Sequence, residues 1–146
     1  MSKIITDLAK FLDEECKKAA KKMAEEVKDL ITDFIMVYYD EYNPKYYDRT
    51  YQFLKSVTTT DVVRDGNGYK VAIYLDDTNI NYDDIDPIVV WDYANRGLHG
   101  GYPPFNGRPS DVHFWDDAME LLDKGYLIKK FGEYLKDRGF TVVIGH

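Results

Sequence analysis

The sequence predicts an α+β fold with a long N-terminal helix, a small antiparallel sheet and four further helices. Apolar residues recur at helical spacing from residue 8 to residue 37, an Asp-Gly-Asn-Gly turn separates two strand-like runs, and three later segments begin with capping residues. The 146 residues, of which 45% are hydrophobic and 31% charged, suffice for one domain with a core. We therefore expect residues 1–146 to form a single domain.

The first helix is expected from Lys3 to about Tyr39, with Ser2 as its N-cap. At 1.5 Å per residue it would measure about 50 Å, whereas a compact domain of this size is roughly 30–35 Å across. Because no Gly or Pro interrupts it, we expect the helix to bend or to project from the domain. The single cysteine, Cys16, is expected to be a buried structural thiol. The predicted core stripe consists of Leu8, Leu12, Cys16, Ala20, Met23, Val27, Leu30, Phe34 and Val37.

A tyrosine-rich stretch follows this helix, with six tyrosines between residues 38 and 54. Asn43-Pro44 predicts the start of a second helix that runs to about Val57. Tyrosine combines an apolar ring with a hydroxyl group, so the stretch fits either a helix–helix corner of the core or a dedicated protein–protein surface. The candidate interface residues here are Tyr38, Tyr39, Tyr42, Pro44, Tyr46, Tyr47 and Arg49.

The middle of the chain predicts a β-hairpin, with strands at 58–64 and 69–75 joined by the turn at 65–68. The third helix is expected at 86–97, where Asp86-Pro87 supplies a cap and a first-turn proline. Ser110 is expected to cap a fourth helix that Gly125 ends, and a fifth helix follows from Leu127 to about Arg138. Residues 140–144 are expected to form a last strand that joins the sheet of the hairpin.

The formal net charge of −7 is concentrated in residues 76–92, which contain six aspartates and no basic residue. An acidic protein without a basic stripe is a poor candidate for direct nucleic-acid binding. Asp77, Asn79, Asn81 and Asp83 alternate as the ligands of a calcium loop do. However, Tyr82 and Ile88 stand where the turn glycine and the bidentate glutamate belong. We expect a solvated loop or an acidic patch that faces a basic partner. This patch comprises Asp76, Asp77, Asp83, Asp84, Asp86 and Asp92.

No catalytic constellation or cofactor motif stands out in the sequence. His99 lies in a loop rich in glycine and proline, with no Cys, Ser or second His at metal or triad spacing. One cysteine excludes an internal disulfide and a Cys-rich zinc site. The start of the chain lacks a signal peptide, and no segment is long and apolar enough to span a membrane. We expect a non-enzymatic protein without cofactor or metal, made in a cytoplasm-like compartment.

Two short motifs resemble a known family. They are Tyr42-x-Pro44-x-Tyr46-Tyr47-x-Arg49-Thr50 followed by Leu54-x-Ser56-Val57, and Gly97-Leu98-His99-Gly100-Gly101. Together with the lysine-rich first helix they resemble the head–tail joining and tail-completion proteins of siphophages and of prophages in low-GC Gram-positive bacteria. The likeness extends from the first helix to about Trp115.

The resemblance implies a structural protein that forms rings at the neck or at the top of the tail tube. Its partners would be further copies of itself and other neck or tail proteins, in the virion and in the host cytoplasm during assembly. Such proteins are often monomers before assembly, so the resemblance does not require a ring of the free protein. The long helix and the hairpin would contact neighbouring subunits, and the loop with Leu98 and His99 would contact another neck or tail component. The alternative is a small acidic protein that binds a basic, nucleic-acid-binding partner through the six aspartates.

Overall fold

The structure is a computed structural model that describes residues 3–40, 52–78, 80, 86–97 and 111–143, with side chains of the first helix described from residue 10 onward. The predicted α+β fold is confirmed. The chain forms α1 (Lys3–Asp40) and α2 (Gln52–Lys55), then β1 (Val57–Thr59), β2 (Val63–Asp65), β3 (Gly68–Lys70) and β4 (Ile73–Leu75), and finally α3 (Pro87–Asn95), α4 (Phe114–Asp123) and α5 (Tyr126–Asp137).

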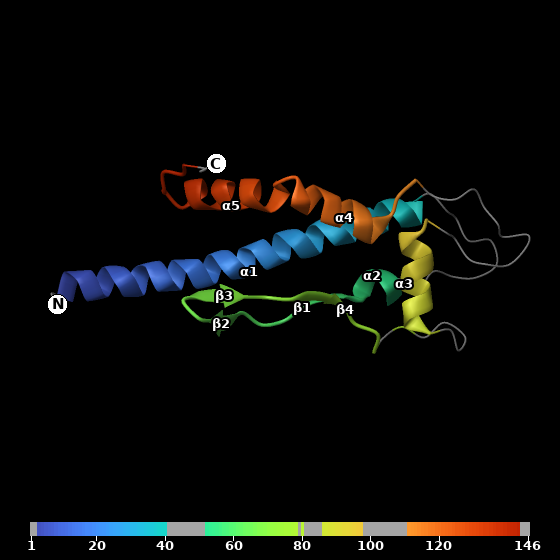
Figure 1. Cartoon of the computed structure of the whole chain (residues 1–146), viewed down its shortest axis with the longest axis horizontal. Helices are drawn as coiled ribbons and strands as arrows, with labels where there is room; N and C mark the ends of the chain where they lie inside the picture. Colours follow the sequence, from blue (N-terminus) through green and yellow to red (C-terminus); the bar gives the residue numbers. More distant parts are fainter. Residues whose placement is uncertain (1–2, 41–51, 79, 81–85, 98–110, 144–146) are drawn as a thin grey trace, which may run out of the picture.

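Helix α1 is the axis of the molecule. Its 38 residues form one continuous helix of about 57 Å. Figure 1 shows α4 and α5 along one side of α1 and the strands along the other, while the N-terminal end of α1 extends beyond both. Of the two expectations from the sequence, bending or projection, the structure therefore shows projection.

The four strands form one long antiparallel hairpin with an interruption in the middle. Strand β1 pairs with β4 and β2 pairs with β3, around a turn in which Gly66 has a φ of 59°. Between the two pairs, the three residues 60–62 lie opposite the two residues 71–72, so the hairpin contains a one-residue bulge. The Thr60 hydroxyl accepts a hydrogen bond from the Ala72 amide at 2.9 Å, which satisfies that amide within the bulge. The predicted hairpin and turn are confirmed.

The helices after the hairpin are joined by specific capping contacts. Asp86 caps α3 by accepting a hydrogen bond from the Ile88 amide at 3.0 Å, as the sequence predicts. Helix α4 begins at Phe114 with His113 at the N-cap position, so the prediction that this helix starts at Ser110 is wrong. The reason is that its first amides are capped from elsewhere in the chain. The Asn95 side chain accepts hydrogen bonds from the amides of Trp115 and Asp116, both at 3.1 Å.

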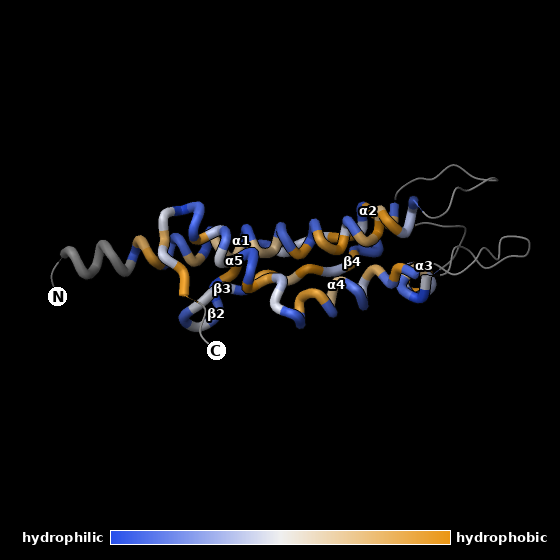
Figure 2. The backbone as a smooth tube through the Cα atoms, turned by 90° about the horizontal axis from the view of Figure 1, so that it is seen from above, coloured by the Kyte–Doolittle hydropathy of each residue, from blue (hydrophilic) through white to orange (hydrophobic). Residues whose placement is uncertain are grey.

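The core lies between α1, the hairpin and α4. Its most enclosed large side chains include Ile31, Ile35 and Phe114, which are at most 1% exposed. Phe114 packs edge-on against Phe53, with ring centroids 5.0 Å apart. In the view from above, hydrophobic stretches of α1, α4 and β4 run along the middle of the molecule (Figure 2).

The core stripe of α1 differs from the predicted one at both ends. Met23, Val27 and Leu30 are buried as predicted, but Leu12, Cys16 and Val37 are exposed. The buried face turns around the helix axis because different elements cover α1 along its length: the hairpin on one side, α4 and α5 on the other. The prediction of a buried Cys16 is therefore wrong.

The C-terminal segment also differs from the prediction. The sequence predicts a strand at residues 140–144, but residues 140–143, the part of it that the structure describes, form no strand. After α5 the chain reverses at Gly139, where φ is 90°, and the Phe140 amide donates a hydrogen bond to the Leu135 carbonyl. Val142 returns to α5, where its side chain lies beside Gly132. The reversal keeps this segment on α5 and away from an edge of the hairpin.

Candidate functional site

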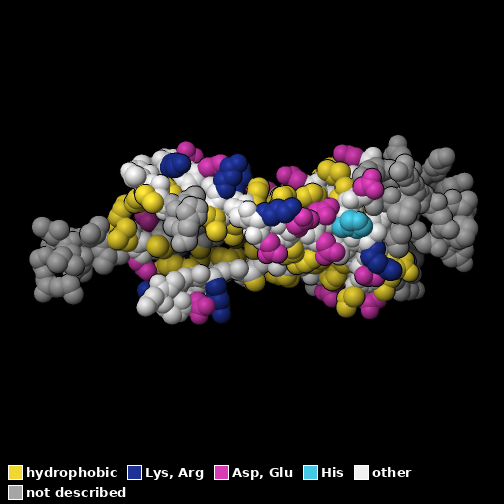
Figure 3. All heavy atoms as spheres, turned by 45° about the horizontal axis from the view of Figure 1, so that its top comes forward, with side chains coloured by type: hydrophobic (Ala, Val, Ile, Leu, Met, Phe, Trp, Pro, Cys, Tyr) yellow, Lys and Arg dark blue, Asp and Glu magenta, His cyan; other side chains and the backbone are white. Residues whose placement is uncertain are grey.

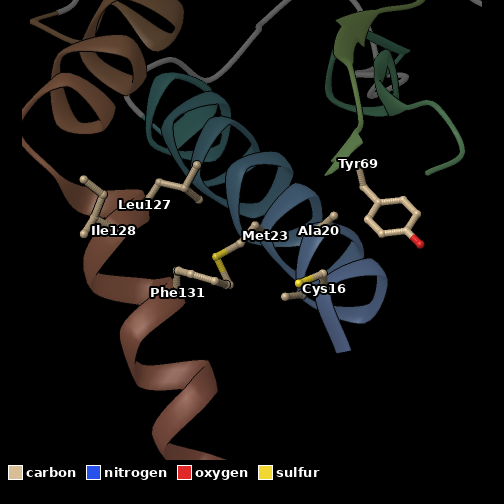
Figure 4. Close-up of a pocket in the computed structure, with 8 residues that line it drawn as sticks. Cys16, Ala20, Met23, Tyr69, Leu127, Ile128 and Phe131 are labelled. Carbon is tan, nitrogen blue, oxygen red and sulfur yellow. The ribbon is translucent and has the colours of Figure 1, made fainter. Parts of the chain in front are cut away.

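An apolar groove lies between α1, α5 and the tip of the hairpin. It has a volume of about 330 Å³. Small and flexible side chains of α1 form its floor, Leu127, Ile128 and Phe131 of α5 form one wall, and Tyr69 of β3 forms the other (Figure 4). The floor residues are Cys16, Ala19, Ala20 and Met23.

Exposed apolar side chains line the groove and lie next to it. Ile128 is 60% exposed, Phe131 41%, and Leu12, one helical turn before Cys16, 45%. Figure 3 shows hydrophobic side chains gathered where α5 lies over the N-terminal half of α1. Contiguous apolar surface of this kind is typical of interaction sites, because exposing it to water is unfavourable.

One end of the groove is held by an ion pair between α1 and the C-cap of α5. The guanidinium group of Arg138 donates two hydrogen bonds to the Glu15 carboxylate, from Nε at 2.5 Å and from Nη2 at 2.6 Å. The Glu15 side chain is buried, and the hydrogen bonds from Arg138 lower the pKa of this carboxyl group. This two-point contact fixes the distance between α1 and the C-terminal end of α5.

The hairpin is held to α1 by a second polar cluster, two residues away on the helix. Arg64 Nη1 donates a hydrogen bond to Asp13 Oδ1 at 2.8 Å, and the Tyr69 hydroxyl donates one to Asp13 Oδ2 at 2.7 Å. Arg64 Nη1 also lies 3.0 Å from the Tyr69 hydroxyl oxygen, to which it donates. Hydrogen bonding to Tyr69 and the charge of Asp13 raise the pKa of Arg64. The cluster positions the Tyr69 ring as a wall of the groove.

The chemistry of the groove favours apolar protein side chains as its ligand. Small-molecule sites usually combine apolar walls with a few polar groups that converge on the ligand. Here the Tyr69 hydroxyl already donates a hydrogen bond to Asp13. Among the side chains that line the groove, the Cys16 thiol is therefore the polar group available to a ligand. Among the residues that the structure describes, no group of three or more His, Cys, Asp or Glu side chains could hold a metal ion.

The tyrosine-rich stretch is described only at its two ends. Tyr38 and Tyr39 are buried, and both pack against Phe53 with ring centroids 6.2 and 6.1 Å apart. The Tyr39 hydroxyl accepts a hydrogen bond from the Leu54 amide at 3.2 Å. These two tyrosines therefore fit the alternative of a core corner. The other candidate interface residues lie outside the described residues: Tyr42, Pro44, Tyr46, Tyr47, Arg49, Leu98 and His99.

The described aspartates of the acidic patch are largely engaged in local structure. The Asp76 carboxylate accepts hydrogen bonds from the amide and the hydroxyl of Thr78, which lower its pKa. Asp86 caps α3, and Asp92 forms an ion pair with Arg96 at 2.9 Å. Asp77 is exposed, while Asp83 and Asp84 lie outside the described residues. Binding of a basic partner through this patch stays a prediction.

The sequence pattern does not predict the groove, although it contains part of the signal. Leu12, Cys16 and Ala20 recur at helical spacing, which predicts core positions, because spacing cannot show where the covering elements end. The exposed pair Ile128 and Phe131, at i and i+3 on α5, is the second part of that signal.

Comparison with known protein families identifies the chain. The sequence model of the YomN family matches residues 4–137, from the first turn of α1 to the end of α5. The chain belongs to the YomN family. This family derives from Bacillus phages and prophages, so the protein is phage-associated. The resemblance described above also implies a phage protein. Searches of curated proteins and of solved structures gave no match.

The YomN region includes every residue that lines the groove. The match also includes most residues of the two polar contacts beside the groove, namely Asp13, Glu15, Arg64 and Tyr69. Arg138 directly follows the last matched residue. None of the described helices is long and apolar enough to cross a membrane.

Proposed function

We propose that this YomN-family protein is a non-enzymatic structural protein of the phage virion, located at the head–tail junction or at the tail terminus. It acts by protein–protein contact and assembles into a ring with further copies of itself. Two kinds of support combine: the family is phage-derived, and the two short motifs resemble head–tail joining and tail-completion proteins.

The observation that carries the proposal is the apolar groove on an elongated molecule. The described fold leaves Cys16, Ile128 and Phe131 of the groove open to solvent, and Leu12 is exposed one helical turn before Cys16. Exposed apolar surface of this kind marks interaction sites, and a subunit of an assembly covers it with a neighbour. The groove also lacks the convergent polar groups that a reaction or a small ligand requires.

Deletion of the gene from an inducible prophage tests the proposal. We expect lysates of the deletion strain to contain filled heads and separate tails, or tails of abnormal end structure, when they are viewed by electron microscopy. Mass spectrometry of purified wild-type virions should detect the protein in a small, fixed number of copies per particle.

Complementation supplies the control for this experiment. Expression of the wild-type chain from a plasmid should restore joined virions, while expression of a chain with a stop codon should not. Normal, infectious virions from the deletion strain would refute the structural role, and so would absence of the protein from purified particles.

A further inference from the structure

The N-terminal end of α1 projects beyond α5 and the hairpin (Figure 1). Arg138 of the α5 C-cap binds Glu15 of α1, and Arg64 of the hairpin binds Asp13. Phe11 and Leu12 lie just beyond these contacts and are 48% and 45% exposed. A short helical segment without tertiary packing is marginally stable in water, so contact with another surface would stabilise it.

The groove offers a matching surface on the same molecule. Its floor is built from the small residues Cys16, Ala19 and Ala20, and its walls rise at Tyr69 and Phe131. The projecting end cannot reach the groove of its own copy, because both belong to one continuous helix from Lys3 to Asp40. An occupant with these side chains must therefore come from another molecule.

We infer that the projecting end of α1, at Phe11 and Leu12, docks in the groove of a second copy of this chain. The inference rests on the proposed function and deepens it, because it names the surfaces through which copies assemble. The docking residues Phe11 and Leu12 are not among the residues that line the groove, so the two surfaces are distinct and the contact is head-to-tail. Head-to-tail contacts generate rings when the rotation between subunits closes and open filaments when it does not.

The charge distribution favours a second copy as the occupant. Three ion pairs lie around the groove: Asp13 with Arg64, Glu15 with Arg138, and Glu133 with Lys130 at 3.7 Å. Residues 1–31 carry seven lysines and seven acidic residues, so the docking helix is also balanced. Of the six aspartates in residues 76–92, Asp86 and Asp92 belong to the cap and body of α3, which lies at the end of the molecule opposite the projecting end (Figure 1). Two copies of this acidic protein can therefore meet here without strong repulsion.

The test uses three variants of the full chain. Phe11→Glu with Leu12→Glu alters the projecting end, and Ile128→Glu alters the groove. Ile88→Glu is the matched control, because Ile88 is also a helical isoleucine, is 66% exposed and lies on α3 at the far end of the molecule. Mass is measured by light scattering and sedimentation up to about 1 mM protein, a concentration that detects even weak association.

We expect the wild-type chain and Ile88→Glu to form oligomers larger than dimers. Each of the other two variants should lose at least roughly tenfold in association, since a carboxylate would be buried in an apolar contact. A mixture of these two variants should form a dimer that does not grow, because one intact end and one intact groove remain between them.

Three results would overturn the inference. The first is a wild-type chain that stays monomeric at every concentration, and the second is oligomerisation that survives both groove and helix-end variants. The third is loss of association in both variants with no dimer in their mixture, which indicates a self-complementary contact. Analysis of the virion separates this inference from the proposed function. A monomeric chain that is present in virions refutes only the docking, and an oligomeric chain that is absent from virions refutes only the virion role.

Discussion

Arg138, the C-cap residue of α5, binds the buried Glu15 carboxylate of α1 through two hydrogen bonds of 2.5 and 2.6 Å. The two residues are 123 positions apart in the sequence, so the ion pair joins the end of the last helix to the first. It holds the C-terminal end of α5, which runs antiparallel to α1, against the stretch of α1 that forms the floor of the groove. The groove therefore depends on this contact for its width.

Replacement of Arg138 tests the contribution of this ion pair to stability. We expect Arg138→Ala to lower the thermal midpoint, because the buried Glu15 carboxylate loses two short hydrogen bonds and keeps only the ion pair with Lys18 at 3.6 Å. Arg138→Lys should lie between the variant and the wild type, since lysine keeps the charge but cannot donate two parallel hydrogen bonds. Calorimetry measures the midpoints. Lys124→Ala is the control, because Lys124 and its partner Glu120 are 67% and 62% exposed. Equal effects of Arg138→Ala and Lys124→Ala would contradict the prediction.

The same pair gives the stability of the protein an acid-dependent component. The hydrogen bonds from Arg138 hold the folded-state pKa of Glu15 below the ordinary value of about 4.3. A group with a depressed folded-state pKa stabilises the protein above its unfolded-state pKa, and this contribution disappears as the pH falls through the folded-state pKa. We expect the stability difference between wild type and Glu15→Gln to be largest near neutral pH and to shrink below about pH 4.3. Urea unfolding at several pH values measures it, and a difference that grows on acidification would contradict the assignment.

Asn95 links α3 to α4, and its removal should destabilise the protein. Its side-chain oxygen accepts hydrogen bonds from the amides of Trp115 and Asp116, and its carbonyl oxygen lies 2.8 Å from His113 Nδ1. We expect Asn95→Ala to reduce the free energy of unfolding by about 0.5–2 kcal/mol, the usual cost of a lost N-cap. Asn95→Asp keeps the acceptor and adds negative charge at a helix N-terminus, so it should retain most of the stability. Urea unfolding compares them, and two equally destabilised variants would argue against a capping role.

The face of α1 that forms the core can be tested with two neighbouring residues. Ile35 is fully buried, whereas Val37, which the spacing assigned to the core, is 46% exposed. We expect Ile35→Ala to reduce the free energy of unfolding by about 2–5 kcal/mol, because it removes buried methyl groups and leaves a cavity. Val37→Ala should change it by no more than about 0.5 kcal/mol. Urea unfolding measures both values. A larger reduction of the free energy of unfolding by Val37→Ala would indicate that Val37 belongs to the core, as the spacing alone predicts.

The outcome for α1 shows what the sequence could and could not determine. Local signals were sufficient for the long helix, for the turn at Gly66 and for the cap at Asp86, because each depends on residues that are close in the chain. The pairing of Asn95 with the start of α4 depends on residues about 20 positions apart, and no local pattern announces it. The groove depends on where α5 and the hairpin end along α1. That position is set by Arg138 and Arg64, whose partners are 123 and 51 residues away.

Cys16 provides a direct probe of the groove. The thiol is exposed on the groove floor, so a thiol reagent should modify it in the folded, dilute protein at a rate comparable with that of the unfolded chain. If a second copy docks in the groove, the rate should fall as the protein concentration rises, because the neighbouring helix covers Cys16. Ile128→Glu should abolish this concentration dependence and keep the fast rate, whereas Ile88→Glu should behave like the wild type. Mass spectrometry of timed samples measures the modification. A thiol that reacts only after denaturation would contradict the exposed position and support the buried one that the spacing of α1 predicts.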